Sequence, residues 1–185
     1  MGKMVECIID SIRVSLTNQE RITLLKEKDA ERYLPIWMGI PETDSITIAL
    51  QGVAIARPMT HDLVISIFNA LDIRLERVEI INLENDTFYA NLVLEQNGIR
   101  QIVDSRPSDA IAVAIRVNAP IFVNEDILEA VGISPEDVLP QVLSEEESTD
   151  VDADFDIFED FLGQIGNDDN NKDDPNDPSD EETNP

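Results

Sequence analysis

Hydrophobic residues in the first part of the chain alternate with polar ones in short runs, a pattern that predicts β-strands. Three such runs cover residues 5–16, 21–26 and 33–38. The period then changes to three or four after Pro41, which is typical of a helix with one apolar face. The residues on that face are Ile46, Ala49, Leu50 and Val53. We expect this helix to end at Gly52.

The same reasoning divides the second part of the chain. A second helix is predicted after Pro58, with Thr60 as its N-cap. Two short turns, Asn85-Asp86 and Asn97-Gly98, separate three further strands and indicate an antiparallel meander. The remaining segments are strands 75–83, 87–95 and 99–103, a helix after 104–109, strand 121–123 and helix 125–131. The chain therefore predicts an α+β fold: a compact mixed domain with an antiparallel β-meander, three to four helices and an acidic C-terminal tail.

Charge divides the 185 residues into unequal parts. Residues 144–185 hold 17 of the 39 acidic residues and one of the 13 basic ones, so most of the net charge of −26 lies there. Within this part, apolar residues recur at helical spacing between 151 and 165, and none follows. We therefore divide the chain into a domain at 1–143, an acidic linker and amphipathic helix at 144–165, and a disordered acidic tail at 166–185.

Composition excludes several classes of protein. The single cysteine, Cys7, and the single histidine, His61, exclude an internal disulfide, cysteine-rich zinc sites and multi-histidine metal sites. No apolar run is long enough to span a membrane, and an acid interrupts the N-terminal segment where a signal peptide is apolar. We expect a soluble cytoplasmic protein without a membrane partner. Its acidity argues against broad electrostatic affinity for DNA or RNA.

Two similar motifs carry the candidate chemistry. Residues 57–62 read RPMTHD and residues 106–109 read RPSD. In each, a proline begins a helix, a hydroxyl residue can cap it, and an acid in the first turn lies beside an arginine. One interpretation is helix capping with an Arg–Asp pair across the two motifs. Trp37, in an apolar strand, is expected in the core rather than as a platform for base stacking.

His61 is the candidate for acid–base chemistry, because histidine is the side chain that ordinarily titrates near neutrality. The helix dipole disfavours its cationic form, so we expect a neutral ring suited to act as a general base. The alternative is a histidine that only hydrogen-bonds a neighbouring carbonyl. Four acids could supply oxygen ligands for Mg²⁺ or Mn²⁺, although no cofactor is certain. They are Glu42, Asp62, Asp104 and Asp109.

Four blocks of this sequence resemble the signature blocks of bacterial members of the bifunctional nuclease (BFN) domain family, in the same order. The blocks are 33–39 (YLPIWMG), 57–63 (RPMTHDL), 87–90 (TFYA) and 104–112 (DSRPSDAIA). The resemblance extends over roughly residues 5–131. It implies a compact α+β domain and the ability, reported for some members, to cleave both DNA and RNA.

The resemblance also points to individual residues. The first motif of the family falls on Arg57, Thr60, His61 and Asp62, and the second on Ser105, Arg106, Ser108 and Asp109. A family glutamate falls on Glu42. This chain departs from the family at Thr43 and Ser45, where alanines are usual, and its acidic tail stands where some members carry a UvrB/UvrC-type helix pair.

From the residues and the resemblance together we predict a nuclease that hydrolyses phosphodiester bonds of DNA or RNA. In this hypothesis His61 is the general base, and Asp62 and Asp109 are the other catalytic residues. Substrate phosphate is bound by Arg57 and Arg106, with Thr60 and Ser108 beside them, and Glu42 and Asp104 are the metal candidates.

The rival hypothesis is a non-enzymatic ligand-binding or protein-binding module that forms oligomers, whose tail helix docks on a protein partner. Geometry separates the two hypotheses: an enzyme should leave His61 and both arginines reachable in one cleft, whereas a structural role should place the arginines in satisfied ion pairs.

Overall fold

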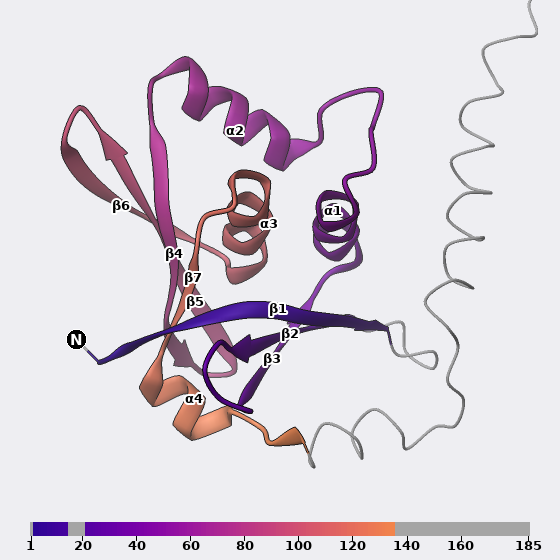
Figure 1. The fold of residues 1–185 in the computed structure, drawn as a ribbon, viewed down its shortest axis with the longest axis vertical. Helices are drawn as coiled ribbons and strands as arrows, with labels where there is room; N and C mark the ends of the chain where they lie inside the picture. The colour runs from indigo at the N-terminus through magenta and orange to yellow at the C-terminus, as the bar shows by residue number, and fades with distance from the viewer. Residues whose placement is uncertain (1, 15–20, 136–185) are drawn as a thin grey trace, which may run out of the picture. The chain divides into compact units, whose positions relative to one another are not determined.

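The computed structural model describes residues 2–14 and 21–135, all within the unit Met1–Ser144. These described residues form seven strands and four helices, as Figure 1 shows. The α+β fold predicted above is confirmed. In chain order the elements are β1 (Met4–Val14), β2 (Arg21–Glu27), β3 (Tyr33–Met38), α1 (Ile40–Gln51), α2 (Thr60–Ala70), β4 (Arg74–Glu84), β5 (Thr87–Gln96), β6 (Ile99–Ser105), α3 (Pro107–Val117), β7 (Ile121–Asn124) and α4 (Glu125–Val131).

The strands form one mixed sheet in the order β3-β2-β1-β7-β4-β5-β6. The predicted meander is confirmed as β4, β5 and β6, which pair in sequence order and antiparallel. Strand β7 lies between β1 and β4 and is parallel to β4, the one parallel pair among the described strands. It thereby joins the N-terminal strands to the meander, an arrangement that no local pattern predicts.

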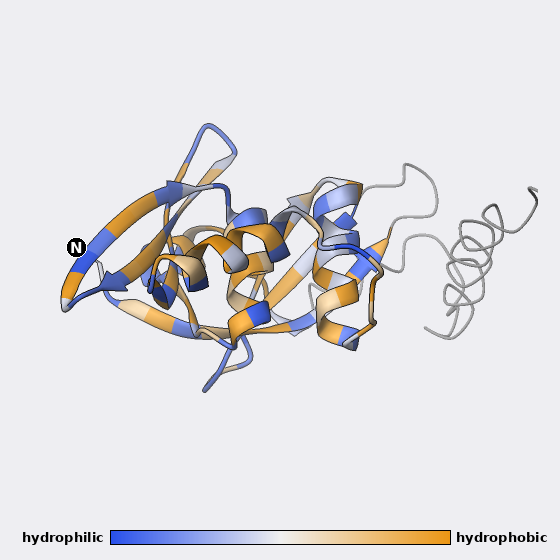
Figure 2. Ribbon diagram, turned by 90° about the horizontal axis from the view of Figure 1, so that it is seen from above, coloured by the Kyte–Doolittle hydropathy of each residue, from blue (hydrophilic) through white to orange (hydrophobic). Residues whose placement is uncertain are grey.

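Backbone preferences explain where the elements begin and end. Both turns of the meander are two residues long, and all four of their residues have positive φ, which suits the twist of a hairpin. Helix α1 ends at Gly52 and α3 at Asn118, each in the left-handed conformation that terminates helices. In Figure 2, hydrophilic blue loops project from the domain, and orange segments alternate with blue ones along the strands.

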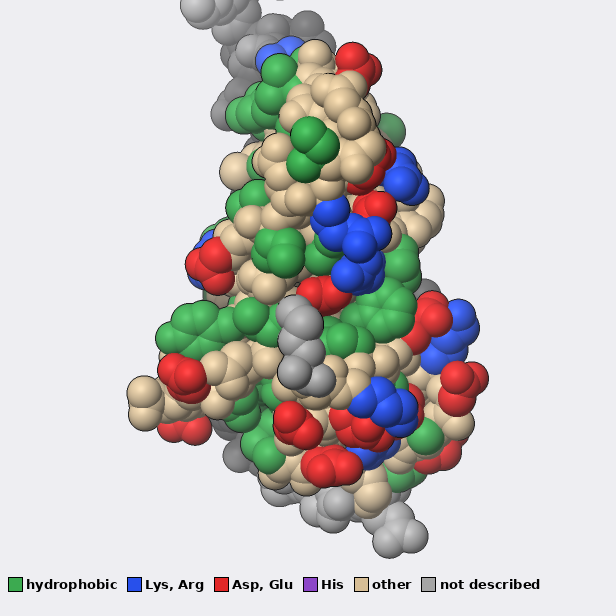
Figure 3. Space-filling view, turned by 90° about the vertical axis from the view of Figure 1, so that its left-hand side faces the viewer, with side chains coloured by type: hydrophobic (Ala, Val, Ile, Leu, Met, Phe, Trp, Pro, Cys, Tyr) green, Lys and Arg blue, Asp and Glu red, His purple; other side chains and the backbone are tan. Residues whose placement is uncertain are grey.

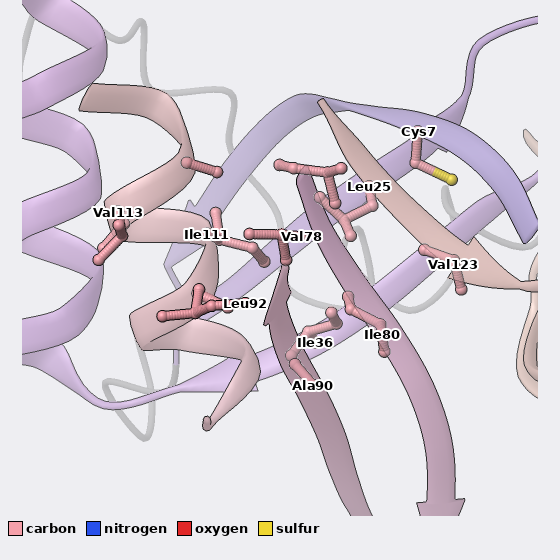
Figure 4. Packing of buried hydrophobic residues seen from close by; sticks show 14 of the residues in the cluster. Cys7, Leu25, Ile36, Val78, Ile80, Ala90, Leu92, Ile111, Val113 and Val123 are labelled. Carbon is pink, nitrogen blue, oxygen red and sulfur yellow. The ribbon is translucent and has the colours of Figure 1, made fainter. Parts of the chain in front are cut away.

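Helix α3 forms the centre of the core. It packs against α1 and α2 on one side and against β4 and β5 on the other. Figure 4 shows Ile111 of α3 next to Val78 of β4, within a cluster that also includes residues of β1, β2, β3 and β7. In Figure 1, α1, α2 and α3 lie above β1, β2 and β3, and α4 lies below them. The motif residues lie in the first turns of α2 and α3. This packing brings those turns close to α1.

Two sequence expectations are wrong in detail. The N-cap of α2 is Met59 rather than Thr60, which is the first residue of the helix. The Asp62 carboxylate accepts the N–H of this N-cap residue, Met59, at 2.8 Å, which is the acid half of a capping box. Trp37 is more than half exposed instead of buried, because its side chain lies on the opposite face of β3 from the one that packs in the core.

The predicted linker, amphipathic helix and acidic tail at 144–185 lie outside the described residues. None of the helices in the described part of the chain has the length and hydrophobicity of a membrane-spanning helix.

Candidate active site

His61 is held by hydrogen bonds at both ring nitrogens. Its Nδ1 lies 2.8 Å from Oγ of Ser45 on α1, and its Nε2 lies 3.1 Å from Oδ1 of Asp109 on α3. The first turns of α2 and α3 and the middle of α1 therefore meet at this ring. His61 and Ser45 are buried, whereas the Asp109 side chain is 35% exposed.

The hydrogen-bond network assigns the protons of this cluster. Burial acts to raise the pKa of Asp109, but hydrogen bonds from Arg106 and His61 outweigh it and hold that pKa below its ordinary value. Because the ionised carboxylate only accepts hydrogen bonds, Nε2 of His61 carries a proton. Ser45 Oγ accepts a hydrogen bond from Arg116 at 2.9 Å and can donate its own proton to Nδ1. A ring protonated on Nε2 therefore satisfies Asp109, and the Ser45 hydroxyl can satisfy Nδ1 by donating to it.

Arg106 covers the Asp109 end of this cluster. Its Nε and Nη2 donate to the two carboxylate oxygens of Asp109 at 2.7 and 3.0 Å, and Nη2 also lies 2.8 Å from Oε1 of Glu42. The hydrogen bonds and charge of Asp109, with a further contribution from Glu42, raise the pKa of the Arg106 guanidinium. The Arg106 side chain is nevertheless 65% exposed. It is therefore a fixed cation that remains open to solvent.

A second arginine, Arg116, joins three helices behind the ring. Its Nε donates to Asp62 on α2 at 2.6 Å, and its Nη2 donates to Oγ and the carbonyl of Ser45 on α1 at 2.9 and 3.2 Å. Its Nη1 donates to the carbonyl of Ala112, one turn earlier in α3. With its side chain only 8% exposed, Arg116 is the buried centre of the cluster.

The Asp62 carboxylate should make stability depend on pH. Burial acts to raise the pKa of Asp62, but the hydrogen bonds from Arg116 and the Met59 N–H outweigh it and lower that pKa. Because the folded value lies below the unfolded one, the ionised form stabilises the fold above about pH 4, and this contribution is lost as the pH falls through the folded pKa.

We therefore expect the stability difference between the wild type and Asp62→Asn to be largest above pH 4 and to shrink toward pH 2. Urea unfolding at a series of pH values measures it. The exposed Asp29 has no hydrogen bond or ion pair among the described residues, so Asp29→Asn is the control and should leave the wild-type pH profile unchanged. A constant difference for Asp62→Asn across this range would contradict the assignment.

The structure brings some of the predicted site residues together and not others. His61, Asp109, Arg106 and Glu42 form one connected cluster, and Asp62 reaches it through Arg116 and Ser45. The predicted Arg–Asp pair across the two motifs is wrong: Arg106 pairs with Asp109 of its own motif, and Asp62 pairs with a different arginine.

The other predicted residues lie outside these contacts. Arg57 is exposed in the segment between α1 and α2, and it makes no hydrogen bond or ion pair with the described residues. Asp104 is exposed on β6. The hydroxyls of Thr60 and Ser108 form no hydrogen bond within the described ranges, and Ser108 is buried in the first turn of α3.

Sequence reasoning missed Ser45 and Arg116. Arg116 is the only charged residue of α3 beyond the first turn, in a run of alanine, isoleucine and valine. A lone charge in an apolar helix signals a buried partner, because an unpaired buried charge is costly. The signal for Ser45 was the departure from the alanine usual in the resembling family.

No metal site is formed by the part of the chain that the structure describes. It contains no group of three or more His, Cys, Asp or Glu side chains placed to hold an ion. Glu42 and Asp109 do converge, but both contact the same Nη2 of Arg106, so the guanidinium occupies the place between them. The residues present therefore do not fit a Mg²⁺ or Mn²⁺ site.

A cavity of about 620 Å³ lies beside the cluster, between α1, the start of α2 and the end of α3. Asp62 and Arg116 line it together with apolar residues. His61, Arg57 and Arg106 are not among its lining residues, so the single cleft expected of an enzyme site is not seen there.

Comparison with known proteins gives the family. The family model described as the bifunctional nuclease domain matches residues 23–136, which include both motifs and the whole cluster. The chain belongs to the bifunctional nuclease domain family. An uncharacterized protein of Mycobacterium tuberculosis (strain H37Rv) is 39% identical over 167 residues, which cover 90% of this chain and 98% of that protein.

Members of the bifunctional nuclease domain family in rice are more distant. Bifunctional nuclease 1 of Oryza sativa subsp. indica is 30% identical over 135 residues, 68% of this chain and 40% of the rice protein. Bifunctional nuclease 2 of Oryza sativa subsp. japonica is 30% identical over 118 residues, 62% of this chain and 36% of that protein. The resemblance found in the sequence blocks is therefore confirmed at the level of the family.

Proposed function

We propose that this protein hydrolyses phosphodiester bonds in DNA or RNA at the cluster around His61. Membership of the bifunctional nuclease domain family supports this proposal, as do the names of the rice relatives. The observation that carries it is the placement of Arg106: an exposed guanidinium, fixed by Asp109 and Glu42 at the start of α3, lies next to a buried histidine. A cytoplasmic location belongs to the same proposal.

Arg106 is the phosphate-binding group in this proposal. Its Nη1 makes no hydrogen bond with the described residues, and guanidinium groups bind phosphate oxygens in fixed geometry. The first backbone N–H groups of α3 point in the direction that favours anions. A phosphate would take the place of Glu42 on Nη2, and the exposed Arg57 would supply a second cation.

His61 supplies the proton transfer. With the ring proton on Nε2, the lone pair on Nδ1 faces buried Ser45, so the ring has no lone pair on its open side to accept a proton from water. If Asp109 withdraws when phosphate binds Arg106, the ring can change tautomer by proton exchange with water: Nε2 gives up its proton and Nδ1 takes one up. The Ser45 hydroxyl then turns away, so that its second lone pair accepts the hydrogen bond from the new Nδ1–H. Nε2 then becomes the general base. Ser45 itself is no nucleophile, since it is buried beneath Arg116.

The test is cleavage of end-labelled single-stranded RNA and DNA by the purified protein, with EDTA and with Mg²⁺. Cleavage above that of an identically prepared His61→Ala protein is the expected result. Equal traces of activity in both preparations would reject the proposal, because they indicate a contaminant.

Removing the Glu42 charge is expected to strengthen nucleic-acid binding. Glu42→Gln takes a competing carboxylate away from Arg106, so we expect the Kd for a labelled oligonucleotide to fall about threefold to fivefold, the scale of a partly exposed ion pair. Fluorescence anisotropy at fixed salt measures this change. The control is Glu31→Gln, which removes the same charge from the Lys26 pair. An equal gain in both variants would show an effect of net charge alone.

The second candidate function is a binding module in which the cluster is structural. The observation that favours it is that both nitrogens of His61 and the carboxylates beside Arg106 already have protein partners. Under this alternative, the wild type hydrolyses no phosphodiester bonds, and substitutions in the cluster change only the stability of the fold.

A further inference from the structure

Strand β6 is an exposed edge of the sheet. It pairs with β5 on one side and ends the strand order on the other. Its three large apolar residues are open to solvent, with Ile99 63%, Ile102 58% and Val103 42% exposed. Figure 3 views the molecule from the side on which β6 lies and shows hydrophobic and basic side chains next to each other on that face.

The two edges of the sheet differ in their protection. At the other edge, β3 contains Pro35, and its Tyr33 exchanges backbone hydrogen bonds with Ile133 at 2.9 and 2.8 Å. Strand β6 has seven residues in regular register, without proline, lysine or a bulge. Native proteins block exposed edges with such features because an open edge pairs with another strand. Strand β6 carries two charged residues, Arg100 and Asp104, so whether these charges repel or match those of a facing strand decides whether this edge can pair.

The hairpin turn determines which backbone groups face outward. The two-residue turn closes between Gln96 and Ile99, and the pair that closes such a turn exchanges backbone hydrogen bonds. Because hydrogen-bonded pairs alternate along an antiparallel ladder, the odd-numbered residues of β6 bond to β5. The N–H and C=O groups of Arg100, Ile102 and Asp104 consequently point away from the sheet.

These three residues are complementary to a second copy of themselves. When two β6 strands lie antiparallel about an axis at Ile102, Ile102 faces Ile102 of the other copy and Arg100 faces Asp104. The outward N–H and C=O groups then pair along the whole strand. We propose that two copies of this chain associate through β6, so that their sheets join into one continuous sheet about a two-fold axis.

The charge pattern selects a second copy as the partner. A two-fold axis requires a surface that matches itself, and a basic and an acidic residue at equal distances from Ile102 provide that match. A docked acidic tail segment would bring carboxylates to Asp104 without such symmetry. Nucleic acid has no backbone amides to continue the ladder. The net charge of −26 per chain opposes association at low salt, so the test uses about 0.15 M salt, where charges more than ~8 Å apart are screened.

Sedimentation equilibrium of the full chain tests the proposal. We expect the wild type to show twice the chain mass of 20.7 kDa and Ile102→Lys, which sets two lysines against each other at the axis, to show the single mass. Ile67→Lys is the matched control, because Ile67 is 47% exposed and lies on helix α2, outside the ladder of strands. A monomeric wild type, or a dimer lost in Ile67→Lys and kept in Ile102→Lys, would overturn the proposal.

Exchanging the charges of Arg100 and Asp104 distinguishes a loss of strand pairing from a loss of the fold. Arg100→Asp sets aspartates against Asp104 of the other copy, and Asp104→Arg sets arginines against Arg100, so each variant alone should dissociate at least about tenfold more readily. Mixing the two variants restores both opposite-charge pairs and should give a heterodimer. Arg100 also bonds Glu76 within its own chain, so circular dichroism checks the fold of both variants. Failure of two folded variants to associate when mixed would contradict the pairing.

Discussion

Replacing Arg116 with methionine is expected to lower the free energy of unfolding by about 3 kcal/mol, the scale for breaking a buried ion pair. The substitution keeps an unbranched, apolar side chain of similar length in α3. It removes the donors to Asp62, to both oxygens of Ser45 and to the carbonyl of Ala112. These acceptors lie at the junction of three helices, and the substitution leaves the Asp62 carboxylate and the buried Ser45 oxygens without these donors.

Denaturant unfolding at neutral pH, at one protein concentration, measures this loss. The matched control is Arg74→Met, because Arg74 is mostly exposed and its pairs with Glu76 and Glu95 are both 3.5 Å long. We expect that control to change stability by less than about 1 kcal/mol. A double variant, Arg116→Met with Asp62→Asn, should cost less than the sum of the two single changes, since it leaves no unpaired charge. An Arg116→Met protein as stable as the control would contradict the buried role.

Replacing His61 with alanine is expected to lower the rate of phosphodiester hydrolysis by about 10²-fold or more, the usual effect of losing a general base. The measurement is the initial cleavage rate at saturating and at low substrate concentration. The loss should appear in kcat, because binding of the phosphate rests on Arg106 rather than on the ring. Asp109→Asn keeps the size of its side chain and tests whether the carboxylate is needed.

His61→Asn separates chemistry from structure. Its amide takes the place of Nδ1 and can still form a hydrogen bond with Ser45, so we expect a thermal unfolding midpoint closer to the wild type than that of His61→Ala. An amide cannot take up a proton, and the rate should therefore fall as far as in the alanine variant. A His61→Asn protein with wild-type activity would remove His61 from the proton transfer and favour the structural interpretation of the cluster.

The sequence predicted the local secondary structure of the two motifs correctly. Proline and the acids of the first turn indicated that residues 57–62 and 106–109 begin helices, and both do. These local signals alone are enough to place His61 and Asp109 at helix starts. The capping residue of α2 was predicted wrongly, because the helix begins at Thr60 itself, and the acid at its third position accepts the N–H of the preceding residue, Met59.

The partners of these residues could not be predicted in the same way. His61 and Asp109 are 48 positions apart, and Asp62 and Arg116 are 54 apart. Helical periodicity gives the buried face of each helix but not the helix that it meets. The expected ion pair between the two motifs does not form for this reason. Asp62 pairs with Arg116 in the last turn of α3, whereas Arg106, the N-cap of α3, pairs with Asp109.

The sequence by itself determined the strands, helices and turns of this protein, because alternation, helical spacing and the φ preferences of proline, glycine and asparagine act within a few residues. Only the tertiary structure decided that β7 enters between β1 and β4, that β6 is left as an open edge, and that Ser45 and Arg116 complete the cluster at His61. Those outcomes depend on the summed packing of many weak contacts between distant segments, which no short stretch of sequence contains.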